Sequence, residues 1–286
     1  MAFILISTAH LREGLWFKDD DDYRAGMNYV AIVSFLLGIP VLAFVLMSNH
    51  VHMVLACSEK EAMAFISAYK KLYSYYYRVK YNHKEFLREN GCDLRSLSQD
   101  NESLERAIAY VQMNPVAANI CLNPTQYPWG TGTSFFDMRP EAGELLGEYS
   151  FRQQIRLFHS KVRLPQEYRL ENGHIRPRSF VKTQWVEAIF RTPKRMHYFL
   201  VNSSKAKSRI ENREPFLPAF RDQSLAASMT DLCRSLFGQE TMENLAREQQ
   251  AEVIRQLRYR FGADIVQVSR VSGIPYETVC QFIDTY

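Results

Sequence analysis

The pattern of apolar and polar residues along the first half of the chain predicts alternating strands and helices. "AFILIS" (Ala2–Ser7) is rich in β-branched and apolar residues and predicts a first strand. Acidic residues suit the start of a helix, so the run Asp19–Asp22 and the apolar segment that follows it to Leu37 predict a helix. "IPVLAFVLMSNHVHMVLA" (Ile39–Ala56) then predicts two apolar strands, or one long bent strand, interrupted near Ser48-Asn49.

Two more helices are predicted before residue 115. Apolar and aromatic residues recur at the helical period from Lys60 to Tyr81. Residues 82–99 are polar and irregular, and the next helix is predicted from Glu102 to Met113. Pro115 should stop that helix, because the residue before a proline is biased away from helical backbone angles. The turn-rich segment Asn123–Phe136 is expected to wrap back over this domain.

After about residue 138, helical segments alternate with polar loops, and no internal repeat is visible. We therefore predict one domain over residues 1–137 and a mainly helical second domain over residues 138–286. The end of the second domain, about residues 251–286, predicts a helix-turn-helix. Its apolar stripe and turn are formed by Ile265, Val268, Val271, Gly273, Val279 and Ile283.

Residues Tyr276, Thr278 and Gln281 would lie on the exposed side of the last helix and would meet DNA. Three-helix units of this kind also occur purely as packing modules. Glu277 and Asp284 do not favour phosphate binding, so both interpretations remain open at this point.

Composition and charge describe a folded protein with an uneven charge distribution. Of its 286 residues, 47% are hydrophobic and 23% are charged, which excludes a disordered chain. No apolar run reaches the roughly 20 residues that span a bilayer, and five scattered cysteines without a CxxC pair suggest reduced thiols in a cytoplasmic protein. The net charge is −2 over residues 1–137 and +6 over residues 138–286, which is compatible with a polyanionic partner.

His50 and His52 are the first candidate functional residues. They are separated by one residue within the apolar run "LMSNHVHMVL", and alternate residues of a strand share one face. Two imidazoles side by side can hold a divalent cation, or they can be two ordinary histidines near a surface.

Tyr110 and Asn114 are a second candidate pair, in the segment "AIAYVQMNPVAANI". Residues four apart on a helix lie on one face, about one turn apart. The plain structural interpretation is that Asn114 ends the helix and that Tyr110 is a half-buried core aromatic.

The phrases "LMSNHVHMVL", "AYVQMNPVAANI" and "PTQYPWGT", in this order, resemble the single-tyrosine HUH transposases of the insertion-sequence and REP-associated type. Members of that family carry a histidine–hydrophobic–histidine strand after a phrase like "LMPNH", a helix like "YIxxNPV" and a "DYPWSS"-like segment. The chain differs at Ser48, where the family commonly has proline, and in "PWGT" at Pro128–Thr131. The resemblance covers about residues 1–137 and implies an α+β, ferredoxin-like domain whose antiparallel sheet bears the histidines.

The resemblance also implies a reaction. Tyr110 would attack a DNA phosphodiester, leaving a 5′-phosphotyrosyl enzyme and a free 3′-hydroxyl. A divalent cation held by His50, His52 and Asn114 would polarise the phosphate. The donor set suits Mg²⁺ or Mn²⁺, although imidazoles would also accept Zn²⁺.

"AYKKLYSYYYRVKYN" (Ala68–Asn82) interleaves tyrosines with four basic residues, Lys70, Lys71, Arg78 and Lys80. Cations can neutralise phosphates while aromatic rings stack on unpaired bases, so contact with DNA is predicted here. Alternatively, several of these tyrosines are core residues and the cations form a solvated face. One of these tyrosines could also be the nucleophile in place of Tyr110.

Three functions follow from these observations. The favoured one is a metal-dependent DNA strand transferase that acts on single-stranded or hairpin ends, either as a monomer or as a homodimer. The second is a domesticated, non-cleaving DNA-binding regulatory protein on the same scaffold. The third, a metal-dependent hydrolase of small substrates, would not explain the C-terminal helix-turn-helix.

Overall fold

The chain forms two compact units in the computed structural model, which describes residues 2–9, 14–82, 91–98, 102–138, 142–203 and 220–284. The larger unit takes in Met1–Ala9, Asp20–Met47 and Val51–Pro215. The smaller unit takes in His10–Asp19, Ser48–His50 and Phe216–Tyr286. Each unit is described separately below.

A four-stranded sheet is the centre of the larger unit. Its elements follow the order β1 (Phe3–Thr8), α1 (Asp20–Leu37), β2 (Val41–Met47), β3 (His50–Leu55), α2 (Glu59–Tyr81) and β4 (Cys92–Leu97), and α3 (Ser103–Ala117) comes next. The strands lie in the order β2-β3-β1-β4, and β1 is antiparallel to both of its neighbours. In this register Ser7 of β1 pairs with His52 of β3 on one side and with Asp93 of β4 on the other.

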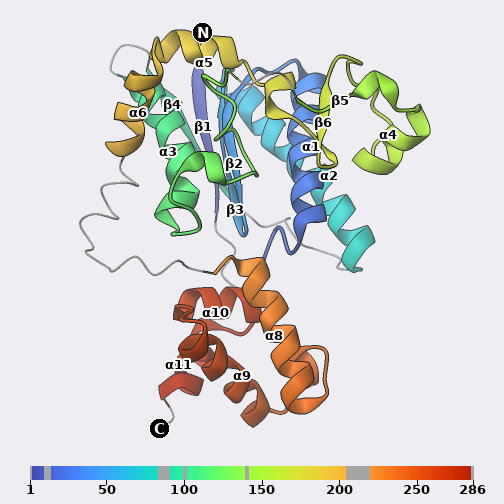
Figure 1. Cartoon of the computed structure of the whole chain (residues 1–286), viewed down its shortest axis with the longest axis vertical. Coiled ribbons are helices and arrows are strands. Elements are labelled where there is room, and N and C mark those ends of the chain that lie inside the picture. Colours follow the sequence, from blue (N-terminus) through green and yellow to red (C-terminus); the bar gives the residue numbers. More distant parts are fainter. Residues whose placement is uncertain are drawn as a thin grey trace. The chain divides into compact units, whose positions relative to one another are not determined.

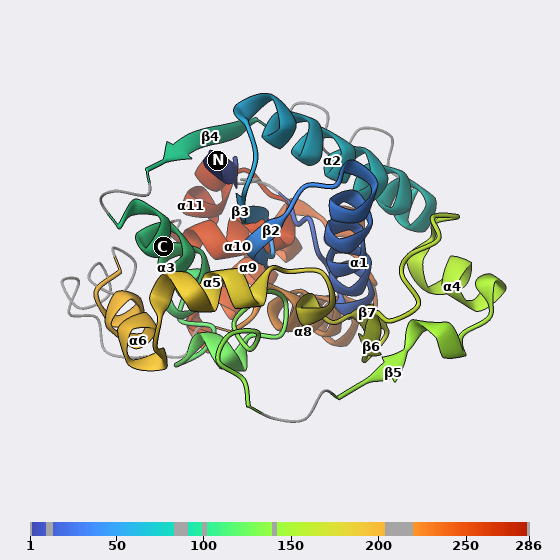
Figure 2. The same ribbon diagram turned by 90° about the horizontal axis from the view of Figure 1, so that it is seen from above.

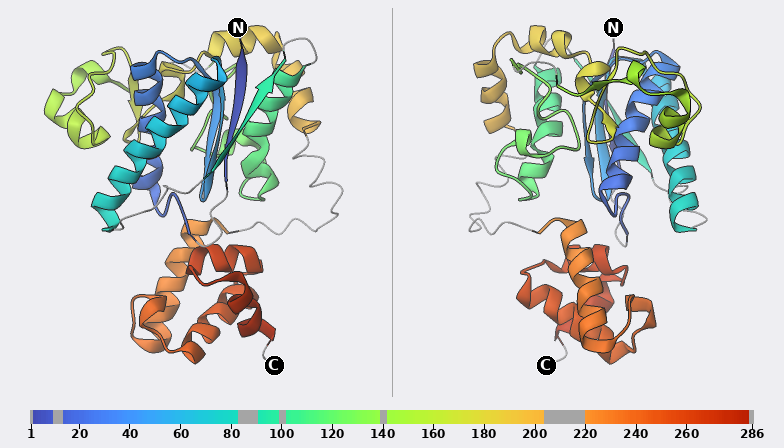
Figure 3. Two further views of the ribbon diagram at one scale, coloured as in Figure 1. Left: turned by 180° about the vertical axis from the view of Figure 1, so that it is seen from behind. Right: turned by 45° about the vertical axis from the view of Figure 1, so that its right-hand side comes forward.

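The two faces of this sheet are covered by different helices, as Figures 1 and 2 show: α1 and α2 lie on one side and α3 on the other. Leu5 and Ser7 line a cavity together with residues of α3, so the buried Ile4 and Ile6 face α1 and α2. Strand side chains alternate between faces, so Phe3, Leu5 and Ser7 belong to the side of α3. The view from behind in Figure 3 shows β4 at the edge of the sheet beside α3.

The segment after α3 wraps over β2, as its turn-rich sequence predicts. A short 3-10 helix, η1 (Pro124–Gln126), leads into it. The Leu46 amide donates to the Trp129 carbonyl at 2.9 Å, and the Thr131 amide donates to the Phe44 carbonyl at 3.0 Å. The Trp129 ring also stacks on Tyr23 of α1, with 4.8 Å between centroids.

Residues 142–203 also belong to the larger unit. They form β5 (Glu144–Leu145), η2 (Leu146–Glu148), α4 (Phe151–Phe158), β6 (Arg169–Glu171), β7 (His174–Ile175), η3 (Pro177–Ser179), α5 (Thr183–Phe190) and α6 (Pro193–Val201). The strands make a small antiparallel sheet of order β5-β6-β7. The Ile175 amide donates to Asn28 of α1 at 2.8 Å, and Trp185 packs edge-on against Phe3 of β1.

These contacts place residues 142–203 on the N-terminal domain, so the division of the chain differs from the predicted boundary after residue 137. The change of sequence pattern near residue 138 therefore marks the start of further helices and short strands of the same unit. The second half is also less purely helical than predicted, because it contains β5, β6 and β7.

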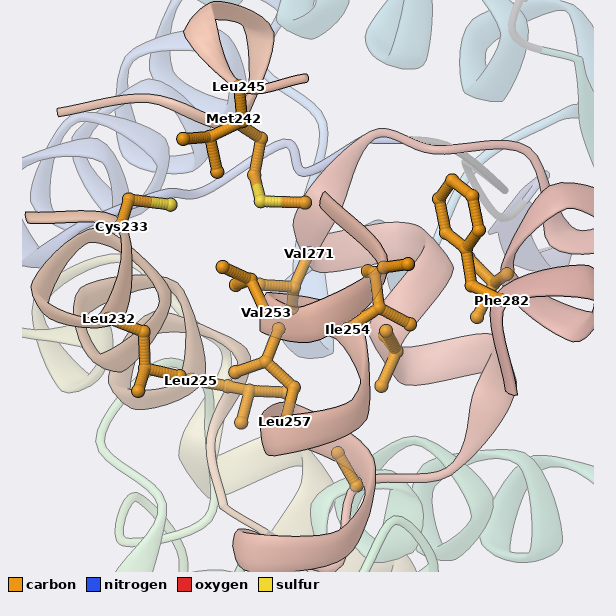
Figure 4. Close-up of a cluster of buried hydrophobic side chains, with 14 residues drawn as sticks. Leu225, Leu232, Cys233, Met242, Leu245, Val253, Ile254, Leu257, Val271 and Phe282 are labelled. Carbon is orange, nitrogen blue, oxygen red and sulfur yellow. The ribbon is translucent and has the colours of Figure 1, made fainter. Parts of the chain in front are cut away.

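The smaller unit is helical and has its own core. It contains α8 (Asp222–Phe237), η4 (Met242–Asn244), α9 (Arg247–Arg260), α10 (Ile265–Ser272) and α11 (Tyr276–Asp284). Figure 4 shows the buried cluster, in which Leu225, Val253 and Leu257 are fully inaccessible to solvent. Asp222, also buried, accepts hydrogen bonds from Gln267 and Arg270 of α10 and from the Ser48 hydroxyl.

Helices α10 and α11 agree with the predicted apolar stripe and turn. Val268, Val271 and Val279 are buried in the core cluster, and Ile265 and Ile283 pack against it. Gly273 ends α10 with φ at +71°, a left-handed conformation that favours glycine.

Two elements near the candidate site differ from the sequence prediction. Residues 92–97, predicted as irregular, form strand β4, because pairing with β1 outweighs a weak local preference for strand. Helix α3 does not stop before Pro115 but continues to Ala117, with the proline inside it.

None of the described helices is both long enough and apolar enough to cross a membrane. The five cysteines are free thiols, and Cys57, Cys121 and Cys233 are buried.

Gly130 provides a test of the wrapping segment. A Cβ atom at this position would lie 2.6 Å from the Phe44 carbonyl oxygen of β2, so Gly130→Ala should lower the free energy of unfolding. We expect a loss of about 1–3 kcal/mol, typical of an overpacked site, in thermal or urea unfolding. Gly91→Ala is the control, because a Cβ atom there meets no atom within 4 Å. Equal stability of the two variants would contradict the close approach of this segment to β2.

Candidate active site

Strand β3 presents His52 to the side of the sheet that α3 covers. His52 is only 2% exposed, and its Nδ1 lies 2.8 Å from the hydroxyl oxygen of its cross-strand partner Ser7. His50, 6% exposed, is the first residue of β3, and its Nδ1 lies 2.8 Å from the Asn49 side-chain oxygen. Both histidines are thus buried and oriented by a hydrogen bond at Nδ1.

These hydrogen bonds bear on which nitrogen of each ring could bind a cation. Since the Asn49 oxygen is an acceptor, Nδ1 of His50 carries the proton and Nε2 carries the lone pair. The Ser7 hydroxyl can donate or accept, and it accepts when Nε2 of His52 is the ligand. A hydrogen bond at one ring nitrogen with the lone pair on the other is the usual arrangement of metal-binding histidines.

Helix α3 places Tyr110 against His52. The two ring centroids are 5.3 Å apart and the rings are nearly perpendicular, at 81°. Tyr110 is half-buried, and this burial raises the pKa of its phenol above the ordinary value, so the hydroxyl is protonated at neutral pH. The structure therefore brings together a histidine of β3 and the predicted nucleophile, although 57 residues separate them in the chain.

Asn114 lies one turn after Tyr110 and is 3% exposed. Its side-chain nitrogen donates to the Tyr110 carbonyl at 2.8 Å and to the Val111 carbonyl at 3.4 Å. Pro115 has no N–H with which to bond Val111, so the Asn114 amide takes that role and lets the helix continue through the proline. Because the side-chain nitrogen of Asn114 donates to these two carbonyls, the side-chain oxygen is the atom that suits a cation.

The predicted ligand residues thus fit a divalent cation chemically, with two imidazole nitrogens and one amide oxygen. Within the described ranges there is no group of three or more His, Cys, Asp or Glu residues that could hold a metal ion. The predicted ligands are two histidines and an asparagine, so they are not a group of this kind. The absence therefore does not bear on a cation held by His50, His52 and Asn114.

A cavity of about 600 Å³ lies next to Tyr110, on the same side of the sheet. Leu5 and Ser7 of β1 form part of its wall, and residues of β4, including the carboxylate Asp93, of α3 and of α6 with the two positions after it form the rest. Arg95 of β4, Arg106 of α3 and the exposed Tyr198 of α6 also line it. Arg106 pairs with Glu102 at 3.1 Å, whereas Arg95 has no ion pair within the described part of the chain.

Arg95, Arg106 and Tyr198 are residues that the sequence analysis missed. Arg95 was hidden because strand β4 was not predicted, and only the strand places it on the same face as Ser7. Arg106 lies one turn before Tyr110 on α3, and this spacing could have identified it. Tyr198 had no visible signal, since α6 follows α3 only after 75 further residues.

The basic and aromatic segment of α2 lies on the opposite side of the sheet from Tyr110. Tyr69, Tyr73, Tyr76 and Tyr77 are buried in the core, so these four rings are not available for stacking on bases. Lys80 pairs with the fully buried Asp22 at 2.8 Å. Lys71 and Arg78 are exposed, while Lys70 is half-buried and its ammonium pKa is lowered by that burial.

The predicted DNA contacts of the smaller unit are only partly exposed. Tyr276 is 49% exposed and Thr278 is half-buried. Gln281 is exposed, and its side-chain oxygen accepts a hydrogen bond from Arg247 of α9 at 3.2 Å. Their role in DNA binding stays a prediction.

Comparisons with known proteins give little support to any assignment. No family model and no curated protein matches the chain. A solved structure described as "Structure of the REP associates tyrosine transposase bound to a REP hairpin" aligns with 60% of this chain and 93% of its own chain. The identity is 11% and the TM-score is 0.39, too low to assign a fold or a function. Any functional assignment therefore depends on the site residues themselves.

Proposed function

We propose that this protein is a DNA strand transferase that cleaves and rejoins single-stranded DNA through Tyr110. The observation that carries the proposal is the contact between the rings of Tyr110 and His52, made by a helix and a strand that are distant in the sequence. A core tyrosine could make the same contact. The neighbouring Asn114, the second histidine of β3 and the arginine-lined cavity together favour a catalytic role.

In the proposed step, the phenolic oxygen of Tyr110 attacks the phosphorus of a DNA phosphodiester. The bond from phosphorus to the 3′-oxygen breaks, and a 5′-phosphotyrosine forms. The phenol loses its proton and the departing 3′-oxygen gains one, so the step is balanced. Because the phosphotyrosine keeps the energy of the broken bond, a 3′-hydroxyl can reverse the attack and no nucleotide cofactor is required.

His50, His52 and Asn114 are the residues that would hold a divalent cation, Mg²⁺ or Mn²⁺. Such a cation would polarise the scissile phosphate and offset the charge that develops on it. The hydrogen bonds that the two imidazoles make to Asn49 and Ser7 hold the rings in place, and the helix backbone holds the Asn114 amide.

The cavity beside Tyr110 suits a single strand of DNA. Arg95 and Arg106 can neutralise phosphates, and the exposed ring of Tyr198 offers a surface for an unpaired base. The element order β1-α1-β2-β3-α2-β4 with sheet order β2-β3-β1-β4 supports a ferredoxin-like description of the domain. Helices α10 and α11, joined at Gly273, support a helix-turn-helix that would contact duplex DNA.

Tyr110→Phe tests the nucleophile. The substitution removes one oxygen, so the fold should persist while covalent capture of DNA is abolished. The measurement is a denaturing gel of protein incubated with labelled single-stranded DNA and Mg²⁺ or Mn²⁺. Tyr259→Phe is the control, because this tyrosine of α9 is exposed, lines neither cavity and should be dispensable for capture.

An adduct that persists in Tyr110→Phe would disprove the assignment and direct attention to the tyrosines of α2. If the parent protein forms no adduct with any of many DNA ends, the protein is better described as a non-cleaving DNA-binding regulator.

The cation site is tested with His50→Phe and His52→Phe. Both side chains are buried, so phenylalanine, which retains a ring, is a milder change than alanine. Each variant should lose Mn²⁺ binding measured by calorimetry and lose cation-dependent cleavage, with a stability change within about 2 kcal/mol. His197→Ala, at an exposed position of α6, should retain both properties. Mn²⁺ affinity equal to that of the parent in both phenylalanine variants would refute the ligand assignment.

A further inference from the structure

A second cavity, of about 990 Å³, opens in the larger unit. Its walls come from α1, α2, the C-terminal end of α4 and the turn at Asn172-Gly173. Figure 2 shows α4 beside α1 and α2, on the side of the sheet away from α3. This cavity shares no lining residue with the one beside Tyr110.

Aromatic and apolar side chains form the walls of this cavity. Tyr76 and His159 are in contact, with ring centroids 5.1 Å apart. Tyr75 and Val79, one helical turn apart on α2, are 57% and 68% exposed and also line the cavity. Burial lowers the pKa of His159, so at neutral pH its ring is an uncharged flat surface like the tyrosines. Such flat surfaces suit a planar, unsaturated ring.

The charged residues of the cavity favour an anion. Arg24, Lys80 and Arg156 line it against a single lining carboxylate, Asp21. Arg24 is paired with Asp21 at 2.6 Å, and Lys80 with the buried Asp22 at 2.8 Å. Arg156, exposed at the end of α4, makes no ion pair within the described ranges, so its charge is available to a ligand.

We propose that this cavity binds an unpaired nucleotide of a DNA strand, with the base against the exposed ring of Tyr75 and the phosphate against Arg156. Planar walls and an unpaired guanidinium match the two parts of a nucleotide, and the volume lies at the upper end of the range for small-ligand pockets, about 300–1,000 Å³. The site gives α2 a role in DNA binding away from Tyr110. It rests on the proposed function only in taking the bound strand to be DNA.

The exposed positions of the site allow a test without loss of the fold. Tyr75→Ala should raise the Kd for a short fluorescent oligothymidylate, measured by anisotropy, about five- to fifty-fold, whereas Tyr75→Phe keeps the ring and should stay within about twofold. Arg156→Ala should raise the Kd and reduce the slope of log Kd against log salt concentration by about 0.7. Arg152→Ala is the matched control, since Arg152 is an exposed arginine of the same helix that does not line the cavity.

An abasic oligomer of equal length, which has no rings to stack, should bind the parent and Tyr75→Ala with equal affinity. Wild-type affinity in Tyr75→Ala and Arg156→Ala would overturn the proposal. So would an equal loss in Arg152→Ala and Arg156→Ala, because it would indicate unspecific attraction to a basic surface. A third outcome would also overturn the proposal: free thymidine monophosphate binds in the cavity, but the variants bind the oligonucleotide as tightly as the parent does. The cavity would then be a mononucleotide site and not a site for a DNA strand.

These outcomes are separate from the test of cleavage. An adduct at Tyr110 together with unchanged binding in the cavity variants would reject this inference alone. Weaker binding in the cavity variants without any adduct would reject the strand-transferase proposal alone.

Discussion

The candidate site depends on the antiparallel pairing of β1 with β3. This pairing sets Ser7 opposite His52 and turns both toward α3. A shift of the register by one residue would turn His52 toward α1 and α2, because strand side chains alternate between faces. Ile4 and Ile6, buried on the opposite face, hold the register, since a slip would move them away from the core formed with α1 and α2. The hydrophobic core of the domain thus determines where the imidazole lies.

The same sheet separates two surfaces with different chemistry. On one side, His52, Tyr110 and Asn114 are buried or half-buried polar groups next to a cavity that contains Arg95 and Arg106. On the other side, the α2 residues Tyr75 and Tyr76 line a cavity that also contains Arg156 of α4. If both cavities take DNA, the strand is held at two places, of which only one includes a nucleophile. Recognition and cleavage would then be separable by mutation.

Local sequence patterns predicted the elements that carry strong signals. The strands around Ser48-Asn49, the long helix that ends at Tyr81 and the wrapping segment with Trp129 were all predicted from apolar runs, helical periodicity or turn residues. Strand β4 was not, because its burial alternates only weakly and its pairing with β1 is a non-local interaction. The extent of α3 was also mispredicted. The prediction that proline ends the helix did not consider the neighbouring side chain. The Asn114 amide donates to the Val111 carbonyl and so replaces the backbone donor that Pro115 lacks. The candidate residues themselves were found through a resemblance in short phrases, and their proximity could be seen only after folding.

The most direct measurement is to identify which residue carries DNA after cleavage. The parent protein would be reacted with single-stranded DNA and Mn²⁺, digested with nuclease and trypsin, and analysed by peptide mass spectrometry. The peptide that begins at Ala107 should carry the added nucleotide mass, and fragment ions should locate it on Tyr110, not on Tyr127 or Tyr149 of the same peptide. A nucleotide on a tyrosine of α2, or on any other residue, would contradict the assignment of Tyr110 as the nucleophile.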